Sequence, residues 1–360
     1  KSRSLPFWAW NSTLEESEIV DQIRSMKKSG IGGFFMHSRE GLETTYMGEK
    51  WKSCIKAAVT EAKKQGMYAW LYDEDRWPSG TAGGKVTRNG GDKFSCKGLT
   101  LEVIRKPSKE VYYKIKEEKN ILALYWMEEK EDMIISLEKM NLQDFVPREA
   151  VLLIARLEIS DKSPWFNNEA PPDNLNPDCT RYFIHCTHEK YKELVGEDFG
   201  KTIPGIFTDE PSLADRHASF HHKRGWIPWT YDFDLYFYEK RGYDIYEILP
   251  FIYFEGEKSR KIRHDYWRTI SQRYCESYSK VISEWCEENG MAYTGHFLQE
   301  DKLGLCARVN GSIMPHYVYQ HVPGIDLLTE QTNEYITVKQ CSSVANQFSK
   351  EITITETYGC

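Results

Sequence analysis

Short apolar segments alternate with longer amphipathic segments along most of the chain. Seven of the apolar segments have the length and composition of buried strands: LPFWAWN, GGFFMHSR, MYAWLYDED, IPGIFTDEP, MAYTGHFLQE, GIDLL and EITITETYGC. The stretches between them have the apolar spacing of helices. Repeated strand–helix units indicate parallel strands joined by right-handed crossovers, and therefore either a barrel or a doubly wound sheet.

The glycine motifs of nucleotide-binding sheets are missing from the sequence. No G-x-G-x-x-G follows the first predicted strand, and no G-x-x-x-x-G-K-[ST] occurs anywhere. We therefore predict an α/β fold, a (β/α)8 TIM-like barrel. Because seven strands are recognised and an eighth is not evident, the barrel could be incomplete. The eighth strand either follows residue 360 or lies unrecognised between 214 and 290.

A different pattern interrupts the alternation between residues 95 and 175. Segments rich in Val, Ile and Tyr alternate with period two, which is typical of antiparallel strands: LTLEVI, VYYKIK, ILALYW, MIISLE and VLLIARLEI. A polar, proline-containing segment then closes the region. We predict an inserted β-rich module at 95–175, and a barrel domain made of residues 1–94 and 176–360.

The charge and the cysteine content of the chain limit its predicted binding partners and its predicted cellular location. The net charge is −7, and charged residues of both signs make up 28% of the chain without a basic stripe, so neither nucleic acid nor a membrane is a predicted partner. The nine cysteines lack C-x-x-C spacing, which indicates reduced thiols and no zinc site. This favours a cytoplasmic location; a secreted or periplasmic one is the alternative if a signal peptide has been removed.

Polar residues follow nearly every predicted strand. They are Asn11, His37, Arg39, Asp73 to Asp75, Asp209, Glu210, His296, Glu300, Asp326, Glu356 and Tyr358. In (β/α) barrels the chemistry is carried by the C-terminal ends of the strands. The pattern therefore predicts a functional site at that end of the barrel.

Side-chain alternation distinguishes the neighbouring acids at these strand ends. Glu210 has the parity of Ile206 and Thr208, so we predict that it points into the barrel, and Glu356 follows a similar apolar stripe. Asp209 has the opposite parity and is expected to face the helices or to support the site. The two glutamates belong to the fourth and seventh strands, on opposite sides of a closed barrel.

Two opposed carboxylates in a cleft are what glycoside hydrolysis requires. We predict Glu210 as the general acid and Glu356 as the base or nucleophile. Aromatic rings would stack on the apolar faces of a sugar, and polar groups would bind its hydroxyls. The predicted substrate-binding residues are Trp8, Asn11, His37, Asp75, Trp77, His296, Glu300 and Tyr358.

Other interpretations of the same residues remain open. A non-catalytic carbohydrate-binding barrel would have both glutamates turned away or paired with arginine. A metal-dependent hydrolase would use His37, His296 and Asp75 as ligands, although each histidine could equally be a hydrogen-bonded core residue. The glycine-rich segment WPSGTAGG could cradle a phosphate or form a structural turn.

Several longer motifs resemble a known family. PFWAWN, GIGGFFMHSREGL, WLYDEDRWPSGTAGG, FTDEPSL, TGHFLQE, PGIDLL and ETYGC are similar to the catalytic barrel of bacterial glycoside hydrolases related to the family 106 α-L-rhamnosidases. The resemblance covers nearly the whole chain outside the β-rich module. It implies an enzyme of carbohydrate metabolism that acts on an oligosaccharide or glycan, within a longer chain that carries further β domains.

The resemblance also implies roles for individual residues. It matches Glu210 to the general acid and Glu356 to the opposing carboxylate. Many retaining barrel glycosidases have asparagine before the acid/base, where this chain has Asp209, so retention and inversion both remain open. No cofactor is predicted from the residues. The family does imply calcium near the site, with Glu300 or Asp75 as the ligands.

Overall fold

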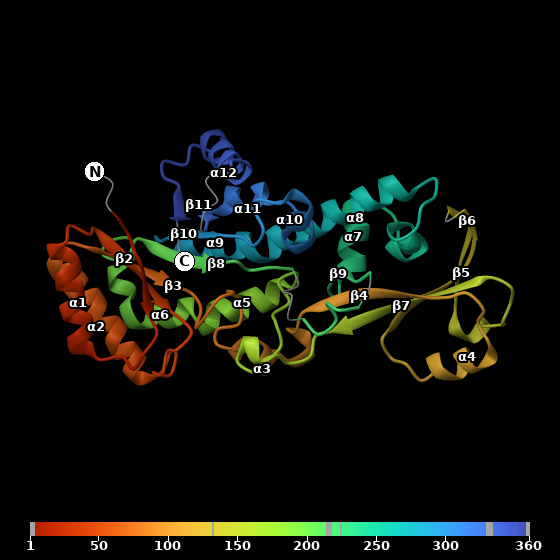
Figure 1. The fold of residues 1–360 in the computed structure, drawn as a ribbon, viewed down its shortest axis with the longest axis horizontal. Helices are drawn as coiled ribbons and strands as arrows, with labels where there is room; N and C mark the ends of the chain where they lie inside the picture. The colour runs from red at the N-terminus through yellow and green to blue at the C-terminus, as the bar shows by residue number, and fades with distance from the viewer. Residues whose placement is uncertain (1–3, 132, 214–217, 224, 329–333, 358–360) are drawn as a thin grey trace.

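The computed structural model describes residues 4–131, 133–213, 218–223, 225–328 and 334–357. The molecule is elongated, with a parallel sheet at one end and an antiparallel sheet at the other (Figure 1). The N-terminus and the C-terminus both lie at the end that holds the parallel sheet. The β-rich region of the sequence extends away from it.

The parallel sheet contains the seven strands that the sequence predicts, all pairing in parallel with their neighbours. In spatial order they are β1 (Phe7–Trp10), β2 (Gly33–Ser38), β3 (Tyr68–Tyr72), β8 (Gly205–Asp209), β10 (Ala292–His296), β11 (Val322–Leu327) and β12 (Ile354–Thr357). In the described part of the chain, β1 and β12 are edge strands. The prediction of a TIM-like barrel without an evident eighth strand is confirmed.

Successive side chains of each strand point to opposite faces of the parallel sheet. Both faces carry apolar side chains. The concave face carries an aromatic cluster of Phe35, Trp70, Tyr72 and Phe207, against which Phe7 of β1 and Ile354 of β12 pack. The opposite face packs on the helices and belongs to the main core. Since residues from both edge strands meet on the concave face, the sheet is curled as in a barrel.

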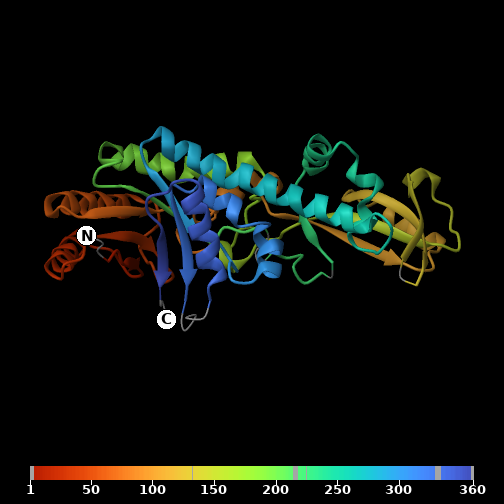
Figure 2. The ribbon, with the colours of Figure 1, turned by 90° about the horizontal axis from the view of Figure 1, so that it is seen from above.

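Helices fill the connections between the parallel strands. They are α1 (Glu16–Lys28), α2 (Glu49–Gln65), α3 (Lys85–Gly90), α5 (Pro177–Cys186), α6 (His188–Val195), α7 (Phe233–Arg241), α8 (Ser259–Tyr274), α9 (Lys280–Glu288), α10 (Leu303–Asn310), α11 (Met314–Tyr319) and α12 (Ile336–Gln347). Short 3-10 turns are η1 (Gly91–Lys93), η2 (Leu142–Asp144), η3 (Pro164–Phe166), η4 (Gly196–Asp198), η5 (Ile245–Glu247) and η6 (Leu249–Ile252). A π-helical turn, η7 (Cys275–Ser279), joins α8 to α9, and this long helical segment runs along the molecule in Figure 2.

The antiparallel sheet contains five strands, in the order β6-β5-β7-β4-β9. They are β4 (Lys97–Ile104), β5 (Ile121–Lys130), β6 (Met133–Met140), β7 (Val151–Ile159) and β9 (Ile227–Trp229). The strand β9 comes from the region in which the sequence indicates mainly helix, and it lies outside the range 95–175.

One strand predicted for the module is wrong. The segment VYYKIK belongs to the helix α4 (Lys109–Ile115). Val111 and Ile115 are four residues apart, so they lie on the same side of this helix, where both pack against the apolar side of β5 and β7. Helical spacing therefore places the same apolar residues in the core as a strand would, which is why the period-two pattern was misleading.

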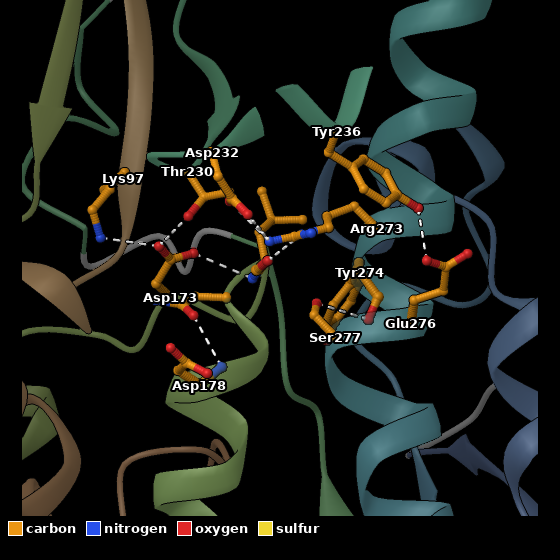
Figure 3. A network of polar contacts seen from close by, with 12 residues as sticks. Lys97, Asp173, Asp178, Thr230, Asp232, Tyr236, Arg273, Tyr274, Glu276 and Ser277 are labelled. Atoms are coloured by element: carbon orange, nitrogen blue, oxygen red, sulfur yellow. Dashed lines mark hydrogen bonds and ion pairs between the residues drawn. The ribbon is translucent and has the colours of Figure 1, made fainter. Parts of the chain in front are cut away.

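A buried polar network joins the antiparallel sheet to the helices (Figure 3). Lys97 of β4 and Asp173 are 0% and 2% exposed at their side chains, and Nζ lies 3.0 Å from a carboxylate oxygen. The hydroxyl of Thr230, beside β9, donates to the same carboxylate at 2.7 Å. Arg273 of α8 pairs with Asp232 at 2.7 Å. Three separate segments of the chain are therefore held together at this junction.

Replacing Lys97 with methionine is expected to lower the free energy of unfolding by about 3–5 kcal/mol, because it leaves the carboxylate of Asp173 buried without its cation. Urea denaturation followed by circular dichroism measures the loss. Lys93→Met is the matched control, since Lys93 pairs with Asp178 at the surface and an exposed pair contributes little. Equal free energies of unfolding for the two variants would contradict the role of the buried pair.

The described residues contain no helix that is long and apolar enough to cross a membrane. The cysteines within them are all free of disulfides. Most of these thiols are buried, and burial raises the pKa of Cys286 and of Cys179 beyond its usual range. Such thiols behave as small apolar core residues.

Candidate active site

Four neighbouring strands of the parallel sheet end in ionisable residues that meet at one edge. Along β8 and β10, Asp209 is directly opposite His296. Along β11 and β12, Asp326 is directly opposite Glu356. Because parallel strands end at the same edge, the register alone brings an imidazole and three carboxylates together.

A glycine makes this close approach possible. Gly295 has φ of 145°, and a Cβ there would lie 1.9 Å from the carbonyl oxygen of Thr208. Any other residue would push β10 away from β8. Gly295 therefore fixes His296, the next residue, beside Asp209.

His296 lies at the centre of the acidic group and is fully buried. Its Nε2 is 2.9 Å from Asp209 and 4.0 Å from Asp326, and its Nδ1 is 3.8 Å from Glu356. Burial alone would lower the pKa of His296, but the hydrogen bond to Asp209 and the surrounding carboxylates raise it well above its usual value. The ring is therefore an imidazolium at neutral pH and offsets part of the negative charge.

Glu210 reaches the same cluster because the backbone turns immediately after β8. Its φ is 42°, in the left-handed region that non-glycine residues rarely adopt, and its N–H donates to the carbonyl oxygen of His296 at 3.1 Å. The indole Nε1 of Trp77 donates to Oε2 of Glu210. Burial raises the pKa of Glu210 to about 8, so its carboxyl group carries a proton at neutral pH.

The predicted inward stripe along β8 is wrong. Ile206 packs in the helix-facing core, and the hydroxyl of Thr208 donates to Asp73. Phe207 is the residue on the concave face, so Asp209 points inward with it and accepts a hydrogen bond from the Tyr72 hydroxyl at 2.6 Å. The alternation of side chains between the two faces ends at Glu210, because the backbone turns there with positive φ. Asp209 and Glu210 therefore both reach the site.

Glu356 reaches the site from β12, an edge strand in the described part of the chain. Its side chain is 22% exposed and borders a cavity of about 520 Å³ that Phe7, Phe35, Phe207 and Ile354 also line. Burial raises the pKa of Glu356 to about 7. A smaller cavity of about 150 Å³ is bordered by Glu210. The two glutamates therefore border different cavities beside the buried imidazolium.

Besides His296, two more of the predicted sugar-binding residues are close to the acids. Trp77 is bound to Glu210, and its ring meets that of Trp165 edge to face with centroids 5.2 Å apart. His37 is buried on the concave face, with its ring centroid 4.0 Å from that of Tyr72, and its Nε2 has no hydrogen-bond partner among the described residues. Burial lowers the pKa of His37 to about 4, so this ring is neutral.

Other predicted residues lie elsewhere. Trp8 faces the helices, where its Nε1 donates to Gln22 at 2.8 Å, because alternation along β1 gives the concave face to Phe7. Asn11 is exposed after the end of β1. Asp75 turns towards Asn167, whose Nδ2 lies 3.1 Å from a carboxylate oxygen. Tyr358 falls outside the described residues.

Glu300 stabilises the framework of the site and also borders the small cavity that Glu210 borders. It is buried and accepts hydrogen bonds from the Tyr317 hydroxyl at 2.8 Å and from the N–H groups of Phe297 and Asp326 at 3.1 Å each. These contacts fix the end of β11 and hold Asp326 in position. The role of Glu300 as a substrate ligand stays a prediction.

Sequence reasoning gave too little weight to three residues. The sequence pattern marks Asp209 and Asp326 only as polar strand ends, and it does not single out Tyr72. The available signal is their position at or next to the C-terminal ends of parallel strands. The contact of the Tyr72 hydroxyl with Asp209 depends in addition on the pairing of β3 with β8.

The described residues contain one group of three side chains able to hold a metal ion, Glu210, His296 and Asp326, with ligand atoms within 4.8 Å of one another. The set predicted from sequence is different, since Asp75 and His37 do not belong to this group. Calcium prefers oxygen ligands, whereas His296 offers nitrogen and is paired with Asp209. The group therefore does not fit calcium.

No protein-family model and no curated protein matches the sequence. Among solved structures, a rhamnosidase from Novosphingobium sp. PP1Y is similar over 99% of this chain and 52% of its own, with a TM-score of 0.69 and 12% identity. This likeness establishes the fold. The chain spans about half the length of that rhamnosidase.

More distant likenesses involve a β-galactosidase from the psychrophilic Marinomonas ef1, with a TM-score of 0.44 and 10% identity over 90% of this chain and 40% of its own. The catalytic domain of a β-amylase from Paenibacillus polymyxa has a TM-score of 0.43 and 11% identity over 98% of this chain and 86% of its own. At these scores the likenesses carry no argument about this chain.

Proposed function

We propose that the protein is a glycoside hydrolase in which Glu210 is the general acid and Glu356 is the base or nucleophile. The observation that carries the proposal is the convergence of both glutamates on one buried imidazolium, His296, at the C-terminal edge of a barrel-like sheet. Glycoside hydrolysis needs one protonated and one ionised carboxyl group on either side of the scissile bond.

The acid role is supported by the surroundings of Glu210. A carboxyl group with a pKa near 8 is protonated at neutral pH and can donate to the oxygen of the leaving group. Since Oε2 accepts a hydrogen bond from Trp77, we expect the proton to be on Oε1. As that proton leaves, the indole N–H stabilises the negative charge that develops on the carboxylate.

The second carboxyl group has a different environment. Glu356 is partly exposed at the larger cavity, and Arg39 and His296 act against the rise in its pKa. It is therefore the more acidic of the two, which suits an ionised base or nucleophile.

A purely binding role is less well supported. A carbohydrate-binding barrel would leave both glutamates paired with arginine or turned outward. Within the described residues, neither Glu210 nor Glu356 forms an ion pair with an arginine, and both contribute to one acidic cluster. Carboxyl groups with raised pKa values beside a cavity are typical of catalytic sites.

The likeness to a rhamnosidase suggests the first substrates to test. We propose an α-L-rhamnoside as the substrate class, and a panel of 4-nitrophenyl glycosides that includes the rhamnoside is the assay. Release of nitrophenol from at least one member, abolished in a Glu210→Gln, Glu356→Gln double variant, is the expected result. Sugar binding without release from any member would contradict catalysis and favour a binding module.

The two pKa values predict a bell-shaped dependence of kcat/KM on pH. Activity rises through about pH 7 as Glu356 loses its proton, and falls through about pH 8 as Glu210 loses the proton that it must donate. Initial rates measured from pH 5 to 10 with subsaturating substrate test this. In Glu210→Gln the basic limb should disappear while the acidic limb stays; a profile that loses the acidic limb would reverse the two assignments.

A further inference from the structure

A buried carboxylate that has no part in the proposed reaction lies beneath the loop after β3. Glu74 is 1% exposed. It accepts hydrogen bonds of 2.6–3.0 Å from five backbone N–H groups, those of Asp75, Gly80, Thr81, Ala82 and Gly83. It forms no ion pair with a lysine or arginine of the described chain, so its partners are main-chain donors.

The loop backbone converges on this carboxylate because several of its residues have positive φ. The values are 129° at Gly80, 52° at Ala82 and 64° at Gly83. Consecutive N–H groups in such a conformation form a concave site for an anion. The sequence left open whether this glycine-rich segment cradles a phosphate. In the structure its donors already bind the protein's own Glu74, so the phosphate interpretation is wrong.

The same loop contacts both acids at the end of β8. Trp77 donates to Glu210. The N–H of Ser79 donates to the carbonyl oxygen of Asp209, and the Ser79 hydroxyl accepts from the N–H of Asp209, each at 2.8 Å. That hydroxyl also donates to Asp73 at 2.6 Å. The conformation of the loop and the geometry of the acidic cluster are therefore coupled.

We propose that Glu74 is a positioning residue, an internal anion that fills a backbone anion-binding site and thereby keeps Trp77 bound to Glu210. Burial raises the pKa of Glu74 to about 7, and the hydrogen bonds from the backbone N–H groups act against this rise. All five partners are donors, so they match the ionised carboxylate, which only accepts hydrogen bonds, whereas an amide would turn N–H groups against some of them. The positioning role rests on the proposed function of Glu210. The anion site does not, because it depends only on the loop.

Removal of the carboxylate should create an anion site that an added anion can fill. In Glu74→Ala the five donors converge on a small cavity, and formate carries the same two oxygens as the lost group. We expect a lower Tm for Glu74→Ala, recovered saturably by sodium formate, and no effect of formate on the wild type. Ser79→Ala is the matched control: it weakens the same loop but keeps Glu74, so formate should not stabilise it.

The positioning role has a separate signature. The hydrogen bond from Trp77 lowers the pKa of Glu210, so its loss in Glu74→Ala should raise that pKa, and formate should reverse the change. The titration of Glu210 by carbon-13 NMR and the basic limb of kcat/KM both report it. We also expect kcat to fall about 100-fold, as for a misplaced catalytic group, with KM nearly unchanged.

The outcomes test the anion site, the positioning role and the proposed function separately. If formate does not stabilise Glu74→Ala, the anion site is overturned. If formate binds but the Glu210 titration in Glu74→Ala without formate is already that of the wild type, the positioning role is overturned. If the wild type hydrolyses no glycoside, the proposed function fails while both of these measurements still stand. Should Glu74→Ala not fold, Glu74→Asp and Glu74→Gln replace it, and a glutamine variant as stable as the aspartate variant would overturn the need for an anion.

Discussion

Replacement of Glu210 by glutamine is expected to lower kcat by about 100- to 10,000-fold on glycosides with a poor leaving group, the range that general acid catalysis contributes. The effect should shrink as the leaving group becomes more acidic, because a dinitrophenolate departs without a proton. Glutamine keeps the shape of the side chain and an oxygen that can accept from Trp77. A series of aryl glycosides with graded leaving groups, compared in the wild type and the variant, measures this dependence.

The control for this variant is Asp301→Asn. Asp301 borders the same small cavity as Glu210, is partly exposed, and has its ion-pair contact with Lys302. Its replacement changes the charge near the site without removing the acid, so kcat should stay close to the wild-type value. An equal loss across all leaving groups in Glu210→Gln would show that Glu210 acts at another step.

His296 explains how so many carboxyl groups can share one edge of the sheet. Asp209, Glu210, Asp326 and Glu356 all lie around it, and like charges so close raise one another's pKa. The imidazolium offsets this effect most strongly at Asp209, whose pKa it lowers through a direct hydrogen bond. The result is a buried ion pair between His296 and Asp209, surrounded by carboxyl groups of raised pKa.

The strands of the barrel could be predicted from the sequence because each is a short apolar run that ends at polar residues. That pattern also predicts that the chemistry lies at the C-terminal ends of the strands, and it singles out Glu210, Glu356 and His296. The pattern says nothing about backbone dihedrals, and the left-handed turn at Glu210 depends on the neighbouring strand, through its hydrogen bond to the carbonyl oxygen of His296. Of the two alternatives predicted for Asp209, facing the helices or supporting the site, the structure has the second.

Contacts between distant segments account for the remaining differences. β9 forms by pairing with Lys97 to Leu99 of β4, more than a hundred residues earlier in the chain, and its own sequence is too short to reveal it. Trp8 was selected for its chemistry, although alternation along β1 assigns it to the helix-facing side. The glycine-rich loop has the composition of a ligand-binding loop, and only the fold shows that Glu74 occupies it.

Glu356→Gln is expected to lower kcat/KM by about 100- to 10,000-fold on activated and poor leaving groups alike, because a base or nucleophile is needed whatever group departs. This uniform loss is opposite to the graded loss expected for Glu210→Gln, so the same series of aryl glycosides separates the two roles. Glu351→Gln is the matched control, since Glu351 is exposed just before β12. Its kcat/KM should equal that of the wild type.

The first anomer released by the wild type then decides between base and nucleophile. Proton NMR of the anomeric signal during early turnover shows retention if Glu356 forms a covalent glycosyl-enzyme intermediate, and inversion if it activates water. A loss in Glu356→Gln confined to poor leaving groups would mean that Glu356 is the acid and that the assignments are exchanged. The asymmetry of the site argues against that exchange, because Trp77 binds Glu210, whereas Glu356 borders the larger cavity.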